Sequence, residues 1–190
     1  MTLEEFVETI RGKAPEELAH EFLMSETVFL FGDAPSYSAF KARITGMLTP
    51  TQHISVVGSG NWRYSLNPEK LFREFCDKSD VDVAIVSNEL FNEYWEEMRM
   101  HHRMHFYALS YRERTNLRRS GENVYAGFIS PAWIPNRDRS KRYEYQRMLN
   151  SLSDSSVRYL KVKMLIFKNR MEAVDYYARG FRLAKQGRPE

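Results

Sequence analysis

Alternating apolar and polar positions divide the chain into short strands and amphipathic helices. Apolar runs rich in β-branched residues cover 54–57 and 81–86, and such runs are typical of buried strands. Residues 157–167 alternate in hydrophobicity and predict a third core strand, and residues 123–129 predict a further one. Apolar positions at helical spacing predict helices over 2–11, 15–24, 35–47, 68–76, 88–104, 142–152 and 170–185.

The order of these elements predicts an α+β fold, in which helices precede and follow a small mixed β-sheet. The dipeptide Thr49-Pro50 ends the third predicted helix, because proline cannot continue one. We therefore expect an N-terminal helical segment over residues 1–50 and a sheet-bearing core with C-terminal helices over residues 51–190. At 190 residues, the two form a single compact domain.

Two carboxylates, Asp80 and Asp82, lie at the start of the 81–86 strand in the sequence SDVDVAIVS. Residues two apart in a strand project from the same face, so the two carboxylates leave the sheet together, roughly 7 Å apart at the backbone. Like charges this close repel each other unless a cation or a proton intervenes. Mg²⁺ binds through one or two carboxylates together with substrate phosphates, and the pair therefore predicts a magnesium site.

A glycine-rich turn, Gly58-Ser59-Gly60, directly follows the 54–57 strand. Glycine permits unusual backbone angles and lets a ligand approach the main chain closely. Ser59 can offer a hydroxyl and an amide to a phosphate oxygen. The turn is neither a Walker loop nor a dinucleotide fingerprint, because the residues that those motifs require at fixed spacing do not follow it.

A strand followed by Gly-Ser, then a second strand bearing Asp-x-Asp, resembles the nucleotidyltransferase superfamily with its polymerase-β-like fold. The resemblance is specific over residues 54–87. It implies that Gly58 and Ser59 bind the phosphates of a nucleoside triphosphate, and that Asp80 and Asp82 are catalytic residues that hold Mg²⁺. Two ions are expected, for which Mn²⁺ can substitute. The reaction implied is transfer of a nucleotide from an NTP or dNTP to a hydroxyl acceptor, with release of pyrophosphate.

The segment between the two motifs, residues 61–79, is longer than in minimal members of that superfamily. It carries Arg63, Lys70, Arg73 and Lys78, which either reach the triphosphate or lie on the solvated face of the 68–76 helix. Beside the glycine turn, Tyr64 and Ser65 are further candidate contacts. The predicted nucleotide-binding set is Gly58, Ser59, Arg63, Tyr64, Ser65 and Lys70.

A third carboxylate is the missing part of the pattern. Active members of the superfamily place another acid on a neighbouring strand, where this chain offers Lys161 and Lys163. The remaining acids that could serve are weak candidates: Glu122, Asp138, Glu144 and Asp154. Without a third acid, the alternatives are a slower enzyme, a base borrowed from the substrate or a partner, or a binding protein without turnover.

The Asp-x-Asp strand runs into Ser87-Asn88-x-Leu90-Phe91, and in this the chain looks like small stand-alone bacterial nucleotidyltransferases of toxin–antitoxin and antiphage systems. That likeness favours synthesis of a nucleotide signal or oligonucleotide in antiviral defence. It leaves open an antitoxin that modifies a protein or tRNA acceptor, an antibiotic nucleotidyltransferase, and a degenerate nucleotide- or RNA-binding module.

Charge differs between the two halves of the chain. Residues 1–98 hold 8 Lys and Arg against 17 Asp and Glu, and residues 99–190 hold 20 against 8, with the densest basic cluster at Arg137, Arg139, Lys141 and Arg142. A basic half suits a polyanionic ligand or acceptor, although solvated helix faces would give the same composition.

The single Cys76 precludes an internal disulfide and indicates a reducing, cytoplasmic location. No apolar run of membrane-spanning length occurs, so no membrane partner is expected, and the oligomeric state is open.

Overall fold

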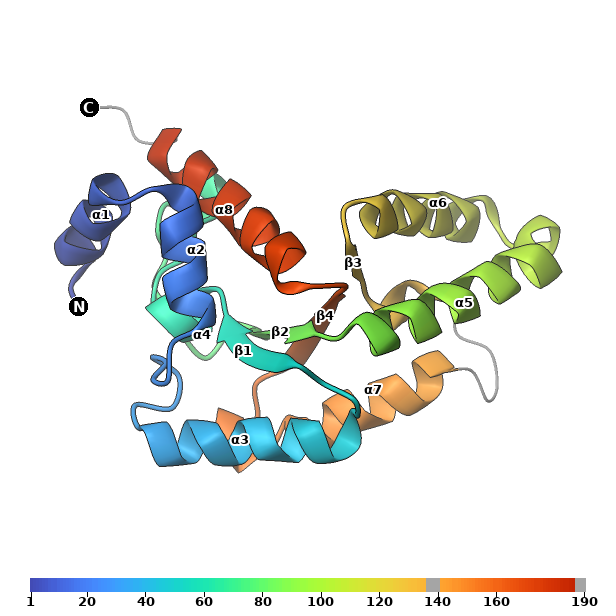
Figure 1. The fold of residues 1–190 in the computed structure, drawn as a ribbon, viewed down its shortest axis with the longest axis horizontal. Coiled ribbons are helices and arrows are strands. Elements are labelled where there is room, and N and C mark those ends of the chain that lie inside the picture. Colours follow the sequence, from blue (N-terminus) through green and yellow to red (C-terminus); the bar gives the residue numbers. More distant parts are fainter. Residues whose placement is uncertain (136–140, 187–190) are drawn as a thin grey trace.

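A four-stranded mixed sheet organises the protein in the computed structural model, which describes residues 1–135 and 141–186 (Figure 1). The strand order is β1-β2-β4-β3, with bounds His53–Val57, Val81–Val86, Val162–Phe167 and Phe128–Ile129 respectively. β1 is antiparallel to β2, β2 is parallel to β4, and β4 is antiparallel to β3. The predicted α+β class with a small mixed sheet and flanking helices is confirmed.

Helices cover both faces of the sheet because the central strands are apolar on both sides. Val81, Val83 and Ile85 face a core built with α3 (Ala34–Met47), α5 (Asn88–His105) and α7 (Lys141–Leu152). Ala84 and Val86 face a second core built with α1 (Leu3–Gly12), α2 (Pro15–Leu23) and α8 (Arg170–Gln186). Asp82 lies two residues before Ala84 in the strand and therefore shares the α8 side of the sheet with Ala84 and Val86.

The three helices of the 1–50 segment pack on the sheet-bearing part of the chain. Phe22 of α2 stacks on Phe181 of α8 with ring centroids 5.7 Å apart. On the other side, Arg43 of α3 pairs with Asp154 at 2.7 Å. Residues from α1, α2 and α3 are thus part of the two cores that enclose the sheet.

The predicted 68–76 helix is wrong. Only a single 3₁₀ turn, Pro68–Lys70, forms there, and Leu71 and Phe72 then adopt left-handed conformations with φ of 46° and 55°. An isolated antiparallel bridge between Tyr64 and Glu74 folds the segment back on itself. This bridge and the packing of the Phe72 ring against Phe6, with centroids 6.2 Å apart, hold the segment in a conformation that a helix could not adopt.

The predicted 123–129 strand was wrong over its first half. A helix that the pattern did not predict, α6 (Tyr111–Tyr125), occupies it, and only Phe128 and Ile129 form a strand. Ser110 starts α6 with a capping box to Glu113, and Gly127 follows its end with φ of 77°. The third core strand is also shorter than predicted, because the 3₁₀ turn Ser155–Val157 and left-handed Arg158 and Tyr159 precede it.

α5 and α6 form a helical hairpin that extends away from the sheet, joined through a 3₁₀ turn at Phe106–Ala108 (Figure 1). After β3, a further 3₁₀ turn at Pro131–Trp133 leads towards α7. Within the described residues, none of the helices combines the length and apolarity needed to cross a membrane.

Asn61, in the short helix α4 (Ser59–Trp62), ties the glycine turn to its surroundings. Its buried amide Nδ2 donates to the carbonyls of Val56 at 2.8 Å and Phe22 at 2.7 Å. Asn61→Ala should lower the free energy of unfolding by about 1–3 kcal/mol, because two acceptors lose their donor. Urea unfolding measures this. Asn92→Ala, which removes one exposed bond to Asn88, is the control, and an equal loss in both variants would contradict the assignment.

Candidate functional site

The glycine turn meets the aspartate pair because of the β1–β2 register. Val57, the last residue of β1, lies opposite Asp82, so Gly58 follows immediately beside that carboxylate. Gly58 has φ of 65°, and a Cβ built on it would lie 3.3 Å from Asp82 Oδ2. A side chain at this position would therefore be strained by its backbone angle and crowded by the carboxylate.

One cavity of about 730 Å³ contains both motifs. Its walls come from the glycine turn, the start of β2, the end of α6 and one side of α8. The residues at its centre are Gly58, Ser59, Asp80 and Asp82, and the others that line it include Trp62, Ser65, Leu66, Lys70, Arg73, Lys78, Asn123, Phe128, Tyr176, Tyr177, Arg179 and Leu183. Residues far apart in sequence are thereby brought together around the two carboxylates.

Four cationic side chains line this cavity: Lys70, Arg73, Lys78 and Arg179. The first three belong to the irregular segment between the two motifs. Because this segment is not a helix, all three side chains lie along one wall of the cavity. Arg179 comes from α8, and sequence reasoning missed it. The α8 helix was predicted, but which of its faces meets the carboxylates depends on packing that a single helix pattern does not specify.

Two of the predicted nucleotide contacts, Arg63 and Tyr64, do not line the cavity. Arg63 pairs through Nε with Glu74 at 2.7 Å and donates through Nη1 to the Met1 carbonyl. Tyr64 is buried in the core, with its ring centroid 5.2 Å from that of Phe6. Ser65 and Lys70, by contrast, lie among the residues that line the cavity.

Lys163 of β4 supplies a cation to the aspartate pair. Its backbone lies opposite Asp82 in the parallel ladder, and its Nζ forms a salt bridge with Asp80 Oδ2. This is the neighbouring-strand position at which the superfamily resemblance implies a third acid. This ion pair offsets the negative charge of Asp80, which is one of the two adjacent carboxylates.

The environment of Asp82 raises its pKa to about 6. Loss of surrounding water is the largest cause, and the negative charge of Asp80 adds to it, while Lys163 and Lys70 act in the opposite direction. The Asp82 side chain nevertheless remains exposed, since the cavity admits water from one side while protein surrounds the carboxylate on others. A partly dehydrated carboxylate next to another favours binding of a cation.

The weak candidates for a third carboxylate lie elsewhere. Glu122 lines a groove between α5 and α6, and Asp154 is engaged with Arg43 and Ser156, which lower its pKa to about 2. Glu144 lines a separate cavity, described below, and Asp138 lies outside the described residues. In the part of the chain that the structure describes, no group of three or more His, Cys, Asp or Glu side chains could hold a metal ion.

A second cavity, of about 420 Å³, adjoins the first at Asp82. The two share Asp82, Tyr176 and Tyr177, and the second one continues along the edge of β4. β3 pairs only with Ile166 and Phe167, which leaves the earlier part of that edge uncovered by a strand. The side chains that line the second cavity include Lys161, Lys163, Trp133 and Gln146.

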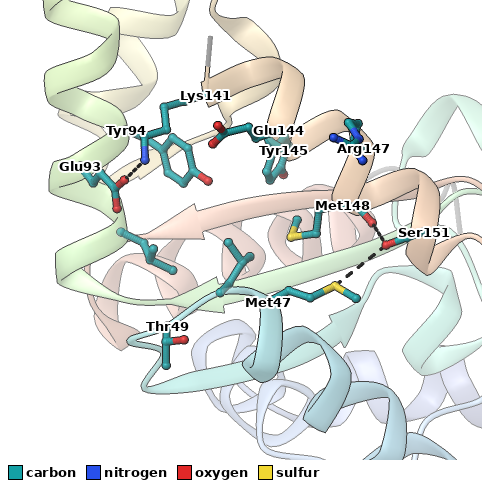
Figure 2. Close-up of a pocket in the computed structure, with 12 residues that line it drawn as sticks. Met47, Thr49, Glu93, Tyr94, Lys141, Glu144, Tyr145, Arg147, Met148 and Ser151 are labelled. Atoms are coloured by element: carbon teal, nitrogen blue, oxygen red, sulfur yellow. Dashed lines mark hydrogen bonds and ion pairs between the residues drawn. The ribbon is translucent and has the colours of Figure 1, made fainter. Parts of the chain in front are cut away.

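A third cavity, of about 600 Å³, lies among α3, α5 and α7 (Figure 2). Lys141 Nζ binds Glu93 Oε1 at 2.5 Å across it, and Met47 and Met148 form part of its apolar wall. None of the predicted phosphate or metal contacts lines this cavity.

The basic cluster predicted from the sequence consists of residues with different surroundings. Lys141 is ion-paired, Arg142 donates to the Ile134 carbonyl, and Arg137 and Arg139 lie outside the described residues.

The raised pKa of Asp82 makes its charge a source of instability in the isolated protein. The folded state holds the proton more tightly than the unfolded chain, so the penalty develops between about pH 4 and 6 and is complete above that range. Asp82→Asn should therefore raise Tm at about pH 7.5 and leave it unchanged at about pH 4. The gain should be about 1 kcal/mol or less, because water screens the carboxylate.

Thermal unfolding at the two pH values measures this effect. Asp77→Asn, in the exposed segment before Asp80, is the control for introducing an amide. A stabilisation by Asp82→Asn that is equal at both pH values would show that the carboxylate charge is not its cause.

Comparison of the chain with protein-family models, with curated proteins and with solved structures found no match. What the protein does is therefore inferred from the chemistry that its own residues bring together around Asp80 and Asp82.

Proposed function

We propose that the protein is a Mg²⁺-dependent nucleotidyltransferase that uses an NTP or dNTP as donor. The observation that carries the proposal is the convergence of Gly58, Ser59, Asp80 and Asp82 on one cavity whose wall also contains four cationic side chains. A volume of about 730 Å³ lies in the range of sites for cofactors and other small ligands. Phosphates are attracted by the cations, and a divalent ion by the carboxylates.

Asp80 and Asp82 would hold the metal. Their oxygen donors suit Mg²⁺, and Lys163 and Lys70 offset only part of their negative charge. When bound, divalent ions supply charge stabilisation to the attacking and leaving oxygens of a phosphoryl displacement. Lys163 would leave Asp80 as the metal binds, and its ammonium would then be free to contact a phosphate oxygen.

Ser59 and the backbone at Gly58 would bind the triphosphate. The close approach of Gly58 to Asp82 Oδ2 brings the two ligand types side by side, as a metal-bound triphosphate requires. Lys70, Arg73, Lys78 and Arg179 would neutralise the remaining phosphate charge. Such pre-placed charges act by positioning and by electrostatic stabilisation, which are the main sources of catalysis in phosphoryl transfer.

The second cavity would admit the acceptor. An acceptor hydroxyl oxygen bonds to the α-phosphorus, the bond from that phosphorus to the bridging oxygen breaks, and pyrophosphate leaves. The hydroxyl proton passes to a phosphate oxygen of the donor, because Asp80 and Asp82 would both be engaged with the metal and the site offers no third carboxylate among the described residues. Synthesis of a nucleotide signal or oligonucleotide in antiphage defence is the role that the likeness over Ser87-Asn88-x-Leu90-Phe91 favours.

The alternative is a nucleotide-binding module without turnover. Lys163 favours it, because a lysine rather than an acid faces the aspartate pair from the neighbouring strand. The two functions differ in their products. Incubation with each radiolabelled NTP and dNTP, with Mg²⁺ or Mn²⁺, should yield pyrophosphate and a nucleotide-bearing product if the protein is a transferase, and neither if it only binds.

Replacing either aspartate should abolish transfer without unfolding the protein. Asp80→Ala and Asp82→Ala each remove half of the metal's protein ligands, and we expect activity to fall by at least about 10²-fold. Pyrophosphate release measures the loss, and circular dichroism checks the fold. Asp77→Ala is the matched control. Retained activity in both single variants would remove the pair from the catalytic site.

Ser59→Ala should weaken triphosphate binding while leaving stability nearly unchanged, because the flanking glycines keep the turn. The expected loss is that of a hydrogen bond to a charged group, about 1.5–3 kcal/mol. Calorimetry with a non-hydrolysable NTP and Mg²⁺ tests it. Ser65→Ala, on the same cavity wall, shows whether the effect is specific to the turn. Unchanged affinity in Ser59→Ala would rule out the contact.

Lys163→Met should strengthen binding of a divalent ion, because the ion no longer competes with the ammonium for Asp80. An exposed ion pair contributes about 0–1 kcal/mol, so the affinity should rise by up to about five-fold. Titration with Mn²⁺ alone, followed by its paramagnetic signal, measures this. Lys168→Met, just beyond β4, is the control. A weaker affinity in Lys163→Met would mean that the lysine does not compete with the ion.

A further inference from the structure

A groove runs between the two helices of the α5–α6 hairpin, away from the carboxylates. It has a volume of about 560 Å³ and an apolar floor that includes Met98, Leu117 and Val124. We call it the hairpin groove, and its lining residues are Trp95, Met98, Arg99, His102, Arg103, Leu117, Arg118, Gly121, Glu122, Val124 and Tyr125. The proposed transfer reaction uses none of these residues.

Arginines line both walls of the hairpin groove. Arg99 and Arg103 project from α5, and Arg118 projects from α6. Glu96 pairs with Arg99 at 2.6 Å, and Glu122 is the single carboxylate among the lining residues. A guanidinium group presents several donors in one plane and matches phosphate oxygens in pairs, so facing arginines favour a phosphate-bearing ligand.

Exposed tyrosines accompany the arginines. Tyr125 is 96% exposed and lies at one end of the groove, while Tyr111, at the start of α6, is 80% exposed. Tyr111, Arg118 and Tyr125 are seven residues apart along α6 and so share one side of the helix, at intervals of about 10 Å. Arginine and aromatic side chains that alternate along a track provide the stacking and charge that single-stranded nucleic acids require.

The hairpin groove borders the cavity that contains the aspartates. Glu122 and Tyr125 line the groove, and their neighbours Asn123 and Ala126 line the cavity of Asp80 and Asp82. The last turn of α6 is thus the shared wall of the two. A nucleic-acid strand lying in the groove would have one end at this shared wall, from which the cavity of Asp80 and Asp82 opens.

We propose that the hairpin groove binds single-stranded nucleic acid, with Arg103 and Arg118 on its phosphates and a base stacked on Tyr125. Binding itself is independent of the transfer reaction. The further statement that this strand is the acceptor rests on the proposed function. An acidic amphipathic helix is less suited to the groove, because Met98 and Leu117 of its floor are buried and offer a helix little apolar surface, while the most exposed ring among the lining residues is the single Tyr125.

Fluorescence anisotropy with a short fluorescein-labelled oligouridylate, without NTP or divalent ion, tests the groove directly. Tyr125→Ala should weaken binding by about 5- to 100-fold through loss of stacking. Arg118→Glu should weaken it at least ten-fold and also reduce the salt dependence, since each neutralised phosphate contributes a log–log slope of about −0.7. Both sites are exposed helix positions, and circular dichroism verifies that the variants fold.

Matched controls use residues of the same types on other surfaces. Tyr159→Ala removes a tyrosine that is 76% exposed outside the hairpin, and Arg147→Glu reverses an exposed charge on α7. Both should bind the oligonucleotide like the unaltered protein. Unchanged affinity in Tyr125→Ala and Arg118→Glu, or equal losses in the controls, would overturn the proposal. Full displacement of the oligonucleotide by a polyglutamate peptide at the same concentration would also overturn it, by indicating an acidic protein ligand.

The Asp80→Ala variant separates this proposal from the transfer reaction. It should bind the oligonucleotide with unchanged affinity, because Asp80 does not line the groove. If the unaltered protein binds the oligonucleotide but transfers no nucleotide, the groove proposal stands and the proposed enzyme activity is wrong. If the protein transfers nucleotides but binds no oligonucleotide, and neither groove substitution changes the transfer rate, the groove proposal is wrong while the proposed enzyme activity stands.

Discussion

The antiparallel ladder between β1 and β2 is the constraint on which the whole site depends. Five residue pairs fix its register, and the last of them, Val57 with Asp82, sets the glycine turn beside a carboxylate. A slip of one residue would turn Asp82 towards the opposite face of the sheet and bury a charge in the core that α3, α5 and α7 form there. Such burial would be costly, so the apolar packing that stabilises the sheet also fixes where the carboxylate points.

Lys163 offsets part of the repulsion between two neighbouring carboxylates. The parallel β2–β4 ladder carries its backbone opposite Asp82, and the flexible side chain reaches Asp80. A surface ion pair of this kind is weak, so the proposed divalent ion would replace it at little cost. Lys163 is therefore compatible with a site in which Asp80 would bind either the lysine ammonium or a metal ion. A third acid at that position could not pair with Asp80 in this way.

The sequence predicted most of the elements that position the site and little of how they meet. Periodicity identified both strands that carry the motifs, and period-two alternation put Asp80 and Asp82 together. The position of Arg179 depends on which side of α8 packs on the sheet. The 68–76 segment is held out of a helix by the bridge between Tyr64 and Glu74 and by the packing of Phe72 against Phe6. Arg63, a predicted nucleotide contact, instead forms an ion pair with Glu74. These outcomes are decided by tertiary contacts, which local pattern does not contain.

In the proposed function, Asp80, Asp82 and the glycine turn together form a site for a metal-bound triphosphate. Crystals grown with Mn²⁺ and a non-hydrolysable NTP test it most directly, because anomalous scattering locates the ion independently of the protein atoms. We expect an anomalous peak about 2.1 Å from carboxylate oxygens of Asp80 and Asp82, with phosphate density at Ser59 and the Lys163 ammonium moved off Asp80. An anomalous peak elsewhere, or triphosphate density away from the glycine turn, would contradict it.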